Sequence, residues 1–270
     1  MKLSAAQIEQ FKTQGYLVVE GFFNERETAA LRADVERLQG LGKLRNVFAG
    51  EQTGGAKQNL QLCPLYTHSD LVRALPFVPK VRESVAALIG APTILHLDQV
   101  FLKPAKHGSG TNWHQDNAYF KIADPMKGTA MWVAVHDATV ANGTIEVIPE
   151  KVGAKLEHGR DPDSDHHIRC YPDETQARPV ELKAGGVVFF AYGVPHCTRA
   201  NRTEKDRAGI AFHFLHADCL KDDLDNAVRP LGTVLNGAEC TGGAKEYGVK
   251  VEGTWEVEIE KLLTPAVTAR

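Results

Sequence analysis

The spacing of apolar residues in the first third of the chain predicts helices around one short strand. Ser4 is a suitable N-cap for a first helix, and Asn24 with Glu27 three residues later has the pattern of a capping box for a second helix. An apolar strand is expected between them at residues 16–19. A further helix is expected over residues 78–89, because a Gly-Ala-Pro sequence follows it.

From residue 93 onward, apolar and polar residues alternate over short segments, which favours β-strands. Strands are expected at residues 94–102, 130–135, 143–148, 178–182, 187–192 and 208–215. Turns rich in Gly, Pro and Asn separate them. Short strands of this kind indicate a mainly β chain with flanking helices, built as a double-sheet jelly roll or a barrel.

One long polar segment, residues 152–177, interrupts the expected strands. A loop of this length inside a compact domain is usually functional or mobile, so we expect an active-site loop. It carries His158, His166 and His167. Because the segment is rich in Asp, we interpret these histidines as solvated surface residues rather than as a second metal site.

We expect a single domain over residues 1–270. Residues 1–92 would form a helical support, residues 93–220 the β core and residues 221–270 a C-terminal extension. In the extension, residues 255–263 alternate as a strand would, but they also fit one face of a helix. Periodicity alone does not decide between the two.

Composition and charge exclude several classes of protein. The formal net charge is -3, and without a basic field a nucleic-acid partner is not expected. The five cysteines are odd in number and form no CxxC pair, which disfavours a disulfide framework and a thiolate zinc site. There is no signal-peptide pattern and no apolar run as long as a membrane helix. We therefore expect a cytoplasmic protein without a membrane partner, and its oligomeric state stays open.

The segment that begins at Trp113 carries the most informative pattern. His114 and Asp116 are two residues apart, so in an extended chain they offer an imidazole and a carboxylate on the same side. His196 follows the apolar strand at residues 187–192 and a Gly-Val-Pro turn, and it is the best candidate for a second imidazole. Two His and one carboxylate on one face of an octahedral Fe(II) ion leave three positions open, which is the facial triad of non-haem iron oxygenases.

Three open positions suit a 2-oxo acid, which takes two of them, and dioxygen, which takes the third. The far carboxylate of 2-oxoglutarate then needs a cation at a fixed reach. Arg207 lies eleven residues after His196, where a following strand would return beside the metal-binding strand. A guanidinium binds a carboxylate through two parallel hydrogen bonds. Thr198, two residues after His196, would add a hydroxyl contact to the same carboxylate.

These residues lie in a chain that resembles the phytanoyl-CoA dioxygenase family, a branch of the Fe(II)/2-oxoglutarate oxygenases. The resemblance rests on GYLVVEGFF and LRADVERL near the N-terminus, on WHQD and MWVAVHDATVANGTIEVIPE in the middle, and on GGVVFFAYGVPHCTRANRTEKDR. It covers most of the chain. It implies a double-stranded β-helix core, of the jelly-roll or cupin-like kind, supported by N-terminal helices.

The resemblance also implies roles for particular residues. It assigns iron binding to His114, Asp116 and His196, and co-substrate binding to Arg207, Thr198, Trp132 and Gln99. Family members that halogenate lack the carboxylate, so Asp116 implies oxygenation. The implied reaction is hydroxylation of a C–H bond with O2 and 2-oxoglutarate, releasing succinate and CO2. The chain departs from the family pattern at residues 150–152, beside the long loop, which concerns the substrate rather than the reaction.

Substrate contacts are less well specified by the sequence. The candidates are Asn112, Asn117, Tyr119, Lys103 and His107. Exposure is the ordinary explanation for the basic residues, and packing for the aromatic one. As ligands they would favour a small, polar or anionic substrate. His213, on an expected core strand, is interpreted as a structural histidine, with a position facing the iron pocket as the alternative.

The alternative function is a cupin-like metal-binding or sensor protein without oxygenase activity. Such a protein would keep the two metal-binding histidines but would need no pocket around Arg207. Binding of 2-oxoglutarate to the Fe(II) form would separate the two functions.

Overall fold

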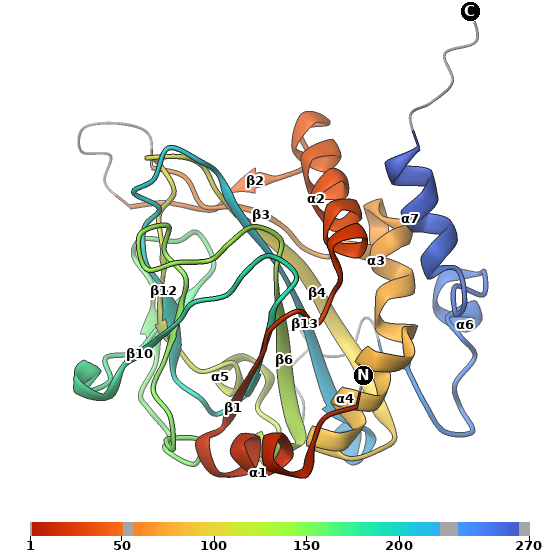
Figure 1. Cartoon of the computed structure of the whole chain (residues 1–270). Helices are drawn as coiled ribbons and strands as arrows, with labels where there is room; N and C mark the ends of the chain where they lie inside the picture. Colours follow the sequence, from red (N-terminus) through yellow and green to blue (C-terminus); the bar gives the residue numbers. More distant parts are fainter. Residues whose placement is uncertain (1, 51–56, 222–231, 265–270) are drawn as a thin grey trace, which may run out of the picture.

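The computed structural model describes residues 2–50, 57–221 and 232–264, and its core consists of two antiparallel sheets (Figure 1). The larger sheet has the order β1 (Tyr16–Val19), β11 (Val187–Ala191), β6 (Gly128–Ala134), β13 (Arg207–His216), β4 (Thr93–Lys103), β3 (Leu60–Leu62) and β2 (Arg45–Asn46), with β14 (Thr233–Val234) beside β4. The smaller sheet has the order β10 (Arg178–Val180), β7 (Ile145–Val147), β12 (His196–Thr198) and β5 (Thr111–His114). A separate hairpin joins β8 (Gly159–Arg160) and β9 (Ile168–Arg169). This is the predicted jelly-roll core.

Most helices lie on the side of the large sheet away from the small sheet, whereas the short helix α5 lines the cavity between the sheets (Figure 1). The α-helices are α1 (Ala5–Gln14), α2 (Glu25–Gly40), α3 (Asp70–Ala74), α4 (Pro79–Ile89), α5 (Asn117–Phe120), α6 (Ala244–Tyr247) and α7 (Trp255–Leu263). Short 3-10 turns are η1 (Tyr66–His68), η2 (Leu75–Phe77), η3 (Pro125–Lys127), η4 (Glu174–Gln176) and η5 (Ala217–Lys221). Within the three described ranges, no helix has both the length and the apolar character that crossing a membrane requires.

The N-terminal helices begin where the sequence predicts. Ser4 Oγ accepts the Gln7 N–H at 3.2 Å, and Asn24 Oδ1 accepts the Glu27 N–H at 2.9 Å, so both side chains cap their helices. The strand expected at residues 16–19 is confirmed as β1, and two further strands, β2 and β3, were not expected. The strands β1, β2 and β3 all belong to the large sheet, on either side of its central strands.

The segment that periodicity left open is the helix α7. Trp255 and Ile259, four residues apart, are buried on its inner face, whereas Val257 between them is 53% exposed. Trp255 Nε1 donates to Glu27 Oε1 at 3.1 Å, and the Glu27 carboxylate also pairs with Lys80 at 2.6 Å. The C-terminal helix is therefore joined to α2 and α4 by hydrogen bonds as well as by apolar packing.

The register around β13 determines which side chains reach the space between the sheets. β13 pairs with β4 on one side and with β6 on the other. Side chains alternate along a strand, so Arg207, Ala211 and His213 face a cavity, whereas Ile210 and Phe212 join the hydrophobic core. One central strand thus supplies the polar and the small residues of the candidate site.

Candidate active site

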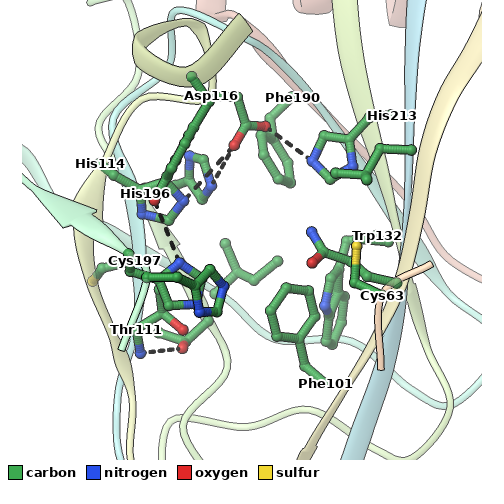
Figure 2. A pocket seen from close by; sticks show the side chains of 18 of the residues that line it. Cys63, Phe101, Thr111, His114, Asp116, Trp132, Phe190, His196, Cys197 and His213 are labelled. Atoms are coloured by element: carbon green, nitrogen blue, oxygen red, sulfur yellow. Dashed lines mark hydrogen bonds and ion pairs between the residues drawn. The ribbon is translucent and has the colours of Figure 1, made fainter. Parts of the chain in front are cut away.

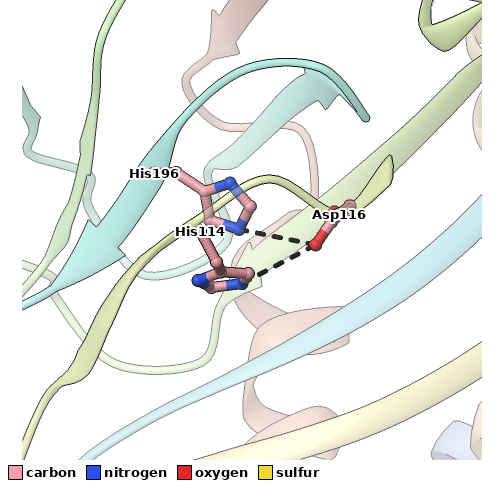
Figure 3. Close-up of side chains that lie close together, drawn as sticks. All are labelled: His114, Asp116 and His196. Atoms are coloured by element: carbon pink, nitrogen blue, oxygen red, sulfur yellow. Dashed lines mark ion pairs between the residues drawn. The ribbon is translucent and has the colours of Figure 1, made fainter. Parts of the chain in front are cut away.

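Two neighbouring strands of the small sheet bring the predicted metal ligands together. His114 ends β5 and His196 begins β12, and the two residues lie directly opposite each other in the antiparallel register. Asp116 follows two residues after His114, just before α5. Figure 3 shows the three side chains pointing toward one another. The pairing of β5 with β12 therefore brings together metal-ligand candidates that are far apart in the sequence.

The distances fit a single metal ion. Asp116 Oδ1 lies 3.7 Å from His114 Nε2 and 3.6 Å from His196 Nε2. All three ligand atoms lie within 4.8 Å of one another. A first-row metal binds nitrogen and oxygen ligands at about 2.0–2.2 Å, so small adjustments bring all three onto one ion. His114, Asp116 and His196 form the facial triad that the sequence predicts.

Backbone carbonyls fix the tautomer of both triad histidines. His114 Nδ1 donates to the Asn112 carbonyl at 2.8 Å, and His196 Nδ1 donates to the Val194 carbonyl at 3.0 Å. Each Nε2 therefore keeps its lone pair for a metal ion. Burial lowers the pKa of His114 to about 3, so this ring is neutral and ready to bind metal at neutral pH.

His213 is a further contact of the triad. Its Nε2 lies 3.4 Å from Asp116 Oδ2, on the side of the carboxylate away from the other two histidines (Figure 2). Burial alone would raise the pKa of Asp116, but the imidazoles of His196 and His213 hold this pKa below its usual range. His213 therefore faces the iron pocket, which is the alternative that the sequence left open. Its spacing is the signal that could have revealed it, because His213 shares a strand face with Arg207.

A cavity of about 210 Å³ lies beside the triad. The sequence candidates that line it are Gln99, Lys103, Tyr119, Trp132, Thr198 and Arg207. Three other candidates do not line it. Asn112 donates to Asp161 Oδ1 at 3.0 Å, Asn117 donates to the Ile122 carbonyl at 3.0 Å, and His107 is exposed. Sequence patterns did not single out the apolar lining, which includes Phe101, Ile145 and Phe190.

Two buried cations lie next to each other at one end of this cavity. Arg207 and Lys103 are register partners on β13 and β4, with exposed fractions of 0% and 1%. Arg207 Nη2 donates to the Gly143 carbonyl, and its guanidinium carbon lies 5.5 Å from the centre of the Trp132 ring. Lys103 Nζ donates to the carbonyls of Gly143, at 3.3 Å, and of Arg199. Burial lowers the pKa of Arg207 to about 9.

Gln115, between two metal ligands, attaches the long polar segment to the triad. Its Nε2 donates to the carbonyls of Ala154 and Gly193, both at 2.6 Å, and its Oε1 accepts the Leu156 N–H at 3.1 Å. The Gln115 N–H donates to His158 Nε2 at 3.1 Å. The prediction that His158 is a solvated surface residue is therefore wrong, because the ring is half-buried and bonded to the metal-binding segment.

The same segment reaches the cavity through His167. This side chain is buried and contacts Gln61 and Tyr119, so the expectation of a solvated His167 is also wrong. His166 is exposed, as predicted, and pairs with Asp165 at 2.6 Å. No sequence pattern joins residues 61, 119 and 167, because they come from a three-residue strand, a single helical turn and a loop.

The sequence model of the family described as "Phytanoyl-CoA dioxygenase (PhyH)" matches residues 11–209. The chain belongs to the phytanoyl-CoA dioxygenase family. Together with the triad, this makes it an Fe(II)- and 2-oxoglutarate-dependent oxygenase, as the sequence predicts.

The chain is similar to curated relatives over most of its length, and solved structures share its fold. Ectoine dioxygenase of Bordetella parapertussis is 23% identical over 253 residues, which cover 87% of this chain and 80% of that protein. Phytanoyl-CoA dioxygenase of Arabidopsis thaliana is 25% identical over 268 residues, which cover 84% of this chain and 94% of that protein. The crystal structure of EvdO2 from Micromonospora carbonacea var. aurantiaca complexed with 2-oxoglutarate matches with a TM-score of 0.64 and 24% identity, covering 80% and 92% of the two chains. The substrates named for these relatives differ, so they do not assign one to this chain.

Proposed function

We propose that this oxygenase hydroxylates a C–H bond of a small molecule while Arg207 and Thr198 anchor 2-oxoglutarate against Trp132. One observation carries the proposal. The guanidinium of Arg207 is fully buried in the wall of the cavity that contains the triad, and no carboxylate of the described residues lies within 4.0 Å of it.

The cost of burying this cation indicates what it binds. Taking an ion out of water costs several kcal/mol even after the protein relaxes, unless a partner offsets the cost. A carboxylate that enters the cavity would form charge-assisted hydrogen bonds worth about 1.5–3 kcal/mol each. Arg207 Nε has no hydrogen-bond partner in the described part of the chain, while Nη2 is held by the Gly143 carbonyl. The guanidinium is thus oriented and still has donors to offer.

Other lining residues complete an anion site at this end. Thr198 Oγ1 accepts the Thr111 N–H at 3.0 Å, which leaves the hydroxyl hydrogen to donate to a carboxylate. The Trp132 ring supplies a flat apolar wall, and Gln99 lines the same cavity. Lys103 adds a second buried amine beside Arg207, so we assign it to the co-substrate rather than to the substrate.

The division of labour follows from this arrangement. Bound at the triad, iron and 2-oxoglutarate supply the oxidising chemistry, in which O2 is consumed, succinate and CO2 are released and an oxygen atom is inserted into a C–H bond. His114, Asp116 and His196 hold the metal from one side and leave its other positions open. Phe190, whose ring centre lies 4.4 Å from that of His196, and other apolar lining residues exclude water from the reaction.

A titration of the Fe(II) protein with 2-oxoglutarate under anaerobic conditions tests the proposal. The bidentate chelate gives a visible charge-transfer absorption, which reports binding without a substrate. Arg207→Ala should weaken 2-oxoglutarate binding by roughly tenfold or more, because at least one charge-assisted bond is lost. Its Fe(II) affinity should change little, and Arg202→Ala, an exposed residue nearby in the sequence, is the matched control.

Two results would contradict the proposal. An unchanged 2-oxoglutarate affinity in Arg207→Ala would remove this residue from the co-substrate site. No 2-oxoglutarate-dependent absorption in the wild-type Fe(II) protein would favour the metal-binding or sensor alternative.

A further inference from the structure

The part of the cavity beyond the triad and the two buried cations is lined by side chains without a fixed charge. These include Cys63, Leu97, Tyr119, Phe120 and His167, with the exposed His166 at the rim. The ring of His167 is neutral, because its Nε2 accepts a hydrogen bond from the Gln61 amide at 2.9 Å and so carries no proton. Among the described residues, no lysine or arginine lines this part of the cavity. This region instead suits a neutral and mostly apolar molecule.

Lys103, which suggested an anionic substrate, is engaged elsewhere, as are two arginines of the long polar segment. Lys103 donates to backbone carbonyls at the co-substrate end. Arg160, in the long polar segment, donates to the Ser164 carbonyl at 3.2 Å, and Arg169 lies 3.9 Å from Asp161. Neither Arg160 nor Arg169 lines the cavity, and Lys103 lines it at the co-substrate end.

One polar group in this region has a hydrogen-bond direction that its neighbours determine. Gln61 Nε2 lies 2.9 Å from His167 Nε2, and because an amide nitrogen can only donate, His167 carries its proton on Nδ1. His167 Nδ1 then donates to the Tyr119 hydroxyl oxygen at 3.3 Å, and the Ile168 N–H donates to the same oxygen at 3.0 Å. Both lone pairs of this oxygen accept, so the Tyr119 hydroxyl hydrogen is left to donate.

Tyr119 is also placed beside the metal centre. It lies three residues after Asp116, and its ring centre is 6.0 Å from that of His114 in an edge-to-face arrangement. A tyrosine phenol has an ordinary pKa of about 10, so it keeps its proton at neutral pH. The cavity wall thus presents a neutral hydrogen-bond donor next to the triad.

We propose that Tyr119 donates this hydrogen bond to the substrate, and that the substrate is a small neutral molecule with an acceptor oxygen, such as a ketone or an ether. Leu97 and Phe120 pack around its apolar part, and Gln61 and His167 are positioning residues that fix the direction of the donor. This inference rests on the proposed function, because it takes the Arg207 end of the cavity as occupied by 2-oxoglutarate.

Matched pairs of probe compounds test the donor directly. Cyclohexanone and methylenecyclohexane have the same shape but only the first has an acceptor oxygen, and tetrahydropyran and cyclohexane form a second pair. In the wild-type protein, the acceptor member of a pair should stimulate succinate release more than its partner. Tyr119→Phe should reduce this advantage by roughly two- to tenfold, the worth of one neutral hydrogen bond. Tyr171→Phe, the same change at a tyrosine that is 78% exposed, should keep the advantage.

The paired design separates lost recognition from a damaged loop. Loss of the Ile168 contact would reduce the response to both members of a pair equally, which would overturn the proposal. An advantage that persists in Tyr119→Phe, or a wild-type protein that no acceptor-bearing probe stimulates, would also overturn it. The anaerobic absorption of the wild-type Fe(II) protein with 2-oxoglutarate is the separate readout, because its absence means that the proposed function itself has failed.

Discussion

A methyl group added at Gly209 would displace the aromatic wall of the proposed co-substrate site. A Cβ at this position would lie 2.1 Å from Trp132 Cζ2 and 2.3 Å from Trp132 Cε2. Non-bonded carbon atoms prefer separations of about 3.5–4.0 Å, so either the strand or the indole must move. β13 is hydrogen-bonded to β4 and β6 along both edges, which makes the indole the part that moves.

The magnitude follows from two contributions. An added carbon in a packed core costs about 1–3 kcal/mol of stability. A displaced indole also loses its position under the Arg207 guanidinium, whose carbon lies 5.5 Å from the ring centre. A desolvated cation–π contact is worth about 2 kcal/mol, and 1.4 kcal/mol corresponds to a tenfold change in affinity. Both contributions lower the free energy of unfolding of Gly209→Ala, by about 3–5 kcal/mol together. We expect 2-oxoglutarate binding to weaken roughly tenfold, because a misplaced guanidinium loses about one charge-assisted bond to the co-substrate.

Two measurements check this expectation. Anaerobic titration of the Fe(II) protein gives the 2-oxoglutarate affinity, and urea unfolding of the metal-free protein gives the stability. Gly159→Ala is the matched control, because a Cβ there meets no atom within 4 Å. If Gly209→Ala binds 2-oxoglutarate as tightly as the wild type, Trp132 does not shape the site, whatever happens to stability.

Two further predictions concern histidines outside the triad. His213→Leu should weaken Fe(II) binding about 10-fold or more, since residues that orient a metal ligand usually contribute that much. His213→Gln keeps a hydrogen-bond donor and should recover part of this loss. Equal Fe(II) affinities of the wild type and both variants in anaerobic titrations would refute the role of His213 in orienting Asp116. His167, whose pKa is lowered from 6.5 to about 3, should make the metal-free protein less stable as the pH falls below 6.5, because only the unfolded state then takes up the proton. Urea unfolding at several pH values should show that His167→Gln flattens this dependence by up to about 1.4 kcal/mol per pH unit, and that His166→Gln, its exposed neighbour, does not. A slope unaltered by His167→Gln would contradict the assignment.

The residues of the site that could be predicted from the sequence are those whose positions follow from the spacing of side chains within one segment. His114 and Asp116 are two residues apart on an extended segment, and the apolar strand β11 leads to His196 through a short turn. Side-chain alternation within a strand is a local property, so it shows in the sequence. The pairing of β5 with β12 is not local, but the chemistry of the three ligands leaves few other ways to join them.

The sequence did not predict the roles of Gln61 and His167, because their positions depend on contacts between separate segments. Gln61 lies on β3, a strand of only three residues, and His167 lies in a polar segment whose composition indicates exposure. Their burial depends on contacts between β3, α5 and the long polar segment, which no spacing within any one of them encodes. Residues 255–263 show the same limit, since the contact of Trp255 with Glu27 selects the helix over the strand.

The face of β13 explains why the two ends of the cavity have a fixed separation. Arg207 and His213 are six residues apart on one face, which at about 3.3 Å per residue is roughly 20 Å of strand. Between them on that face are only Gly209 and Ala211, the first required by the Trp132 ring and the second lining the cavity itself. A strand that is hydrogen-bonded along both edges cannot stretch. The hydrogen bonds that build the sheet therefore also fix the distance between Arg207 at one end and His213, which contacts Asp116, at the other. Because Gly209 and Ala211 have small side chains, the space beside this part of β13 stays open as a cavity and is not filled by packed side chains.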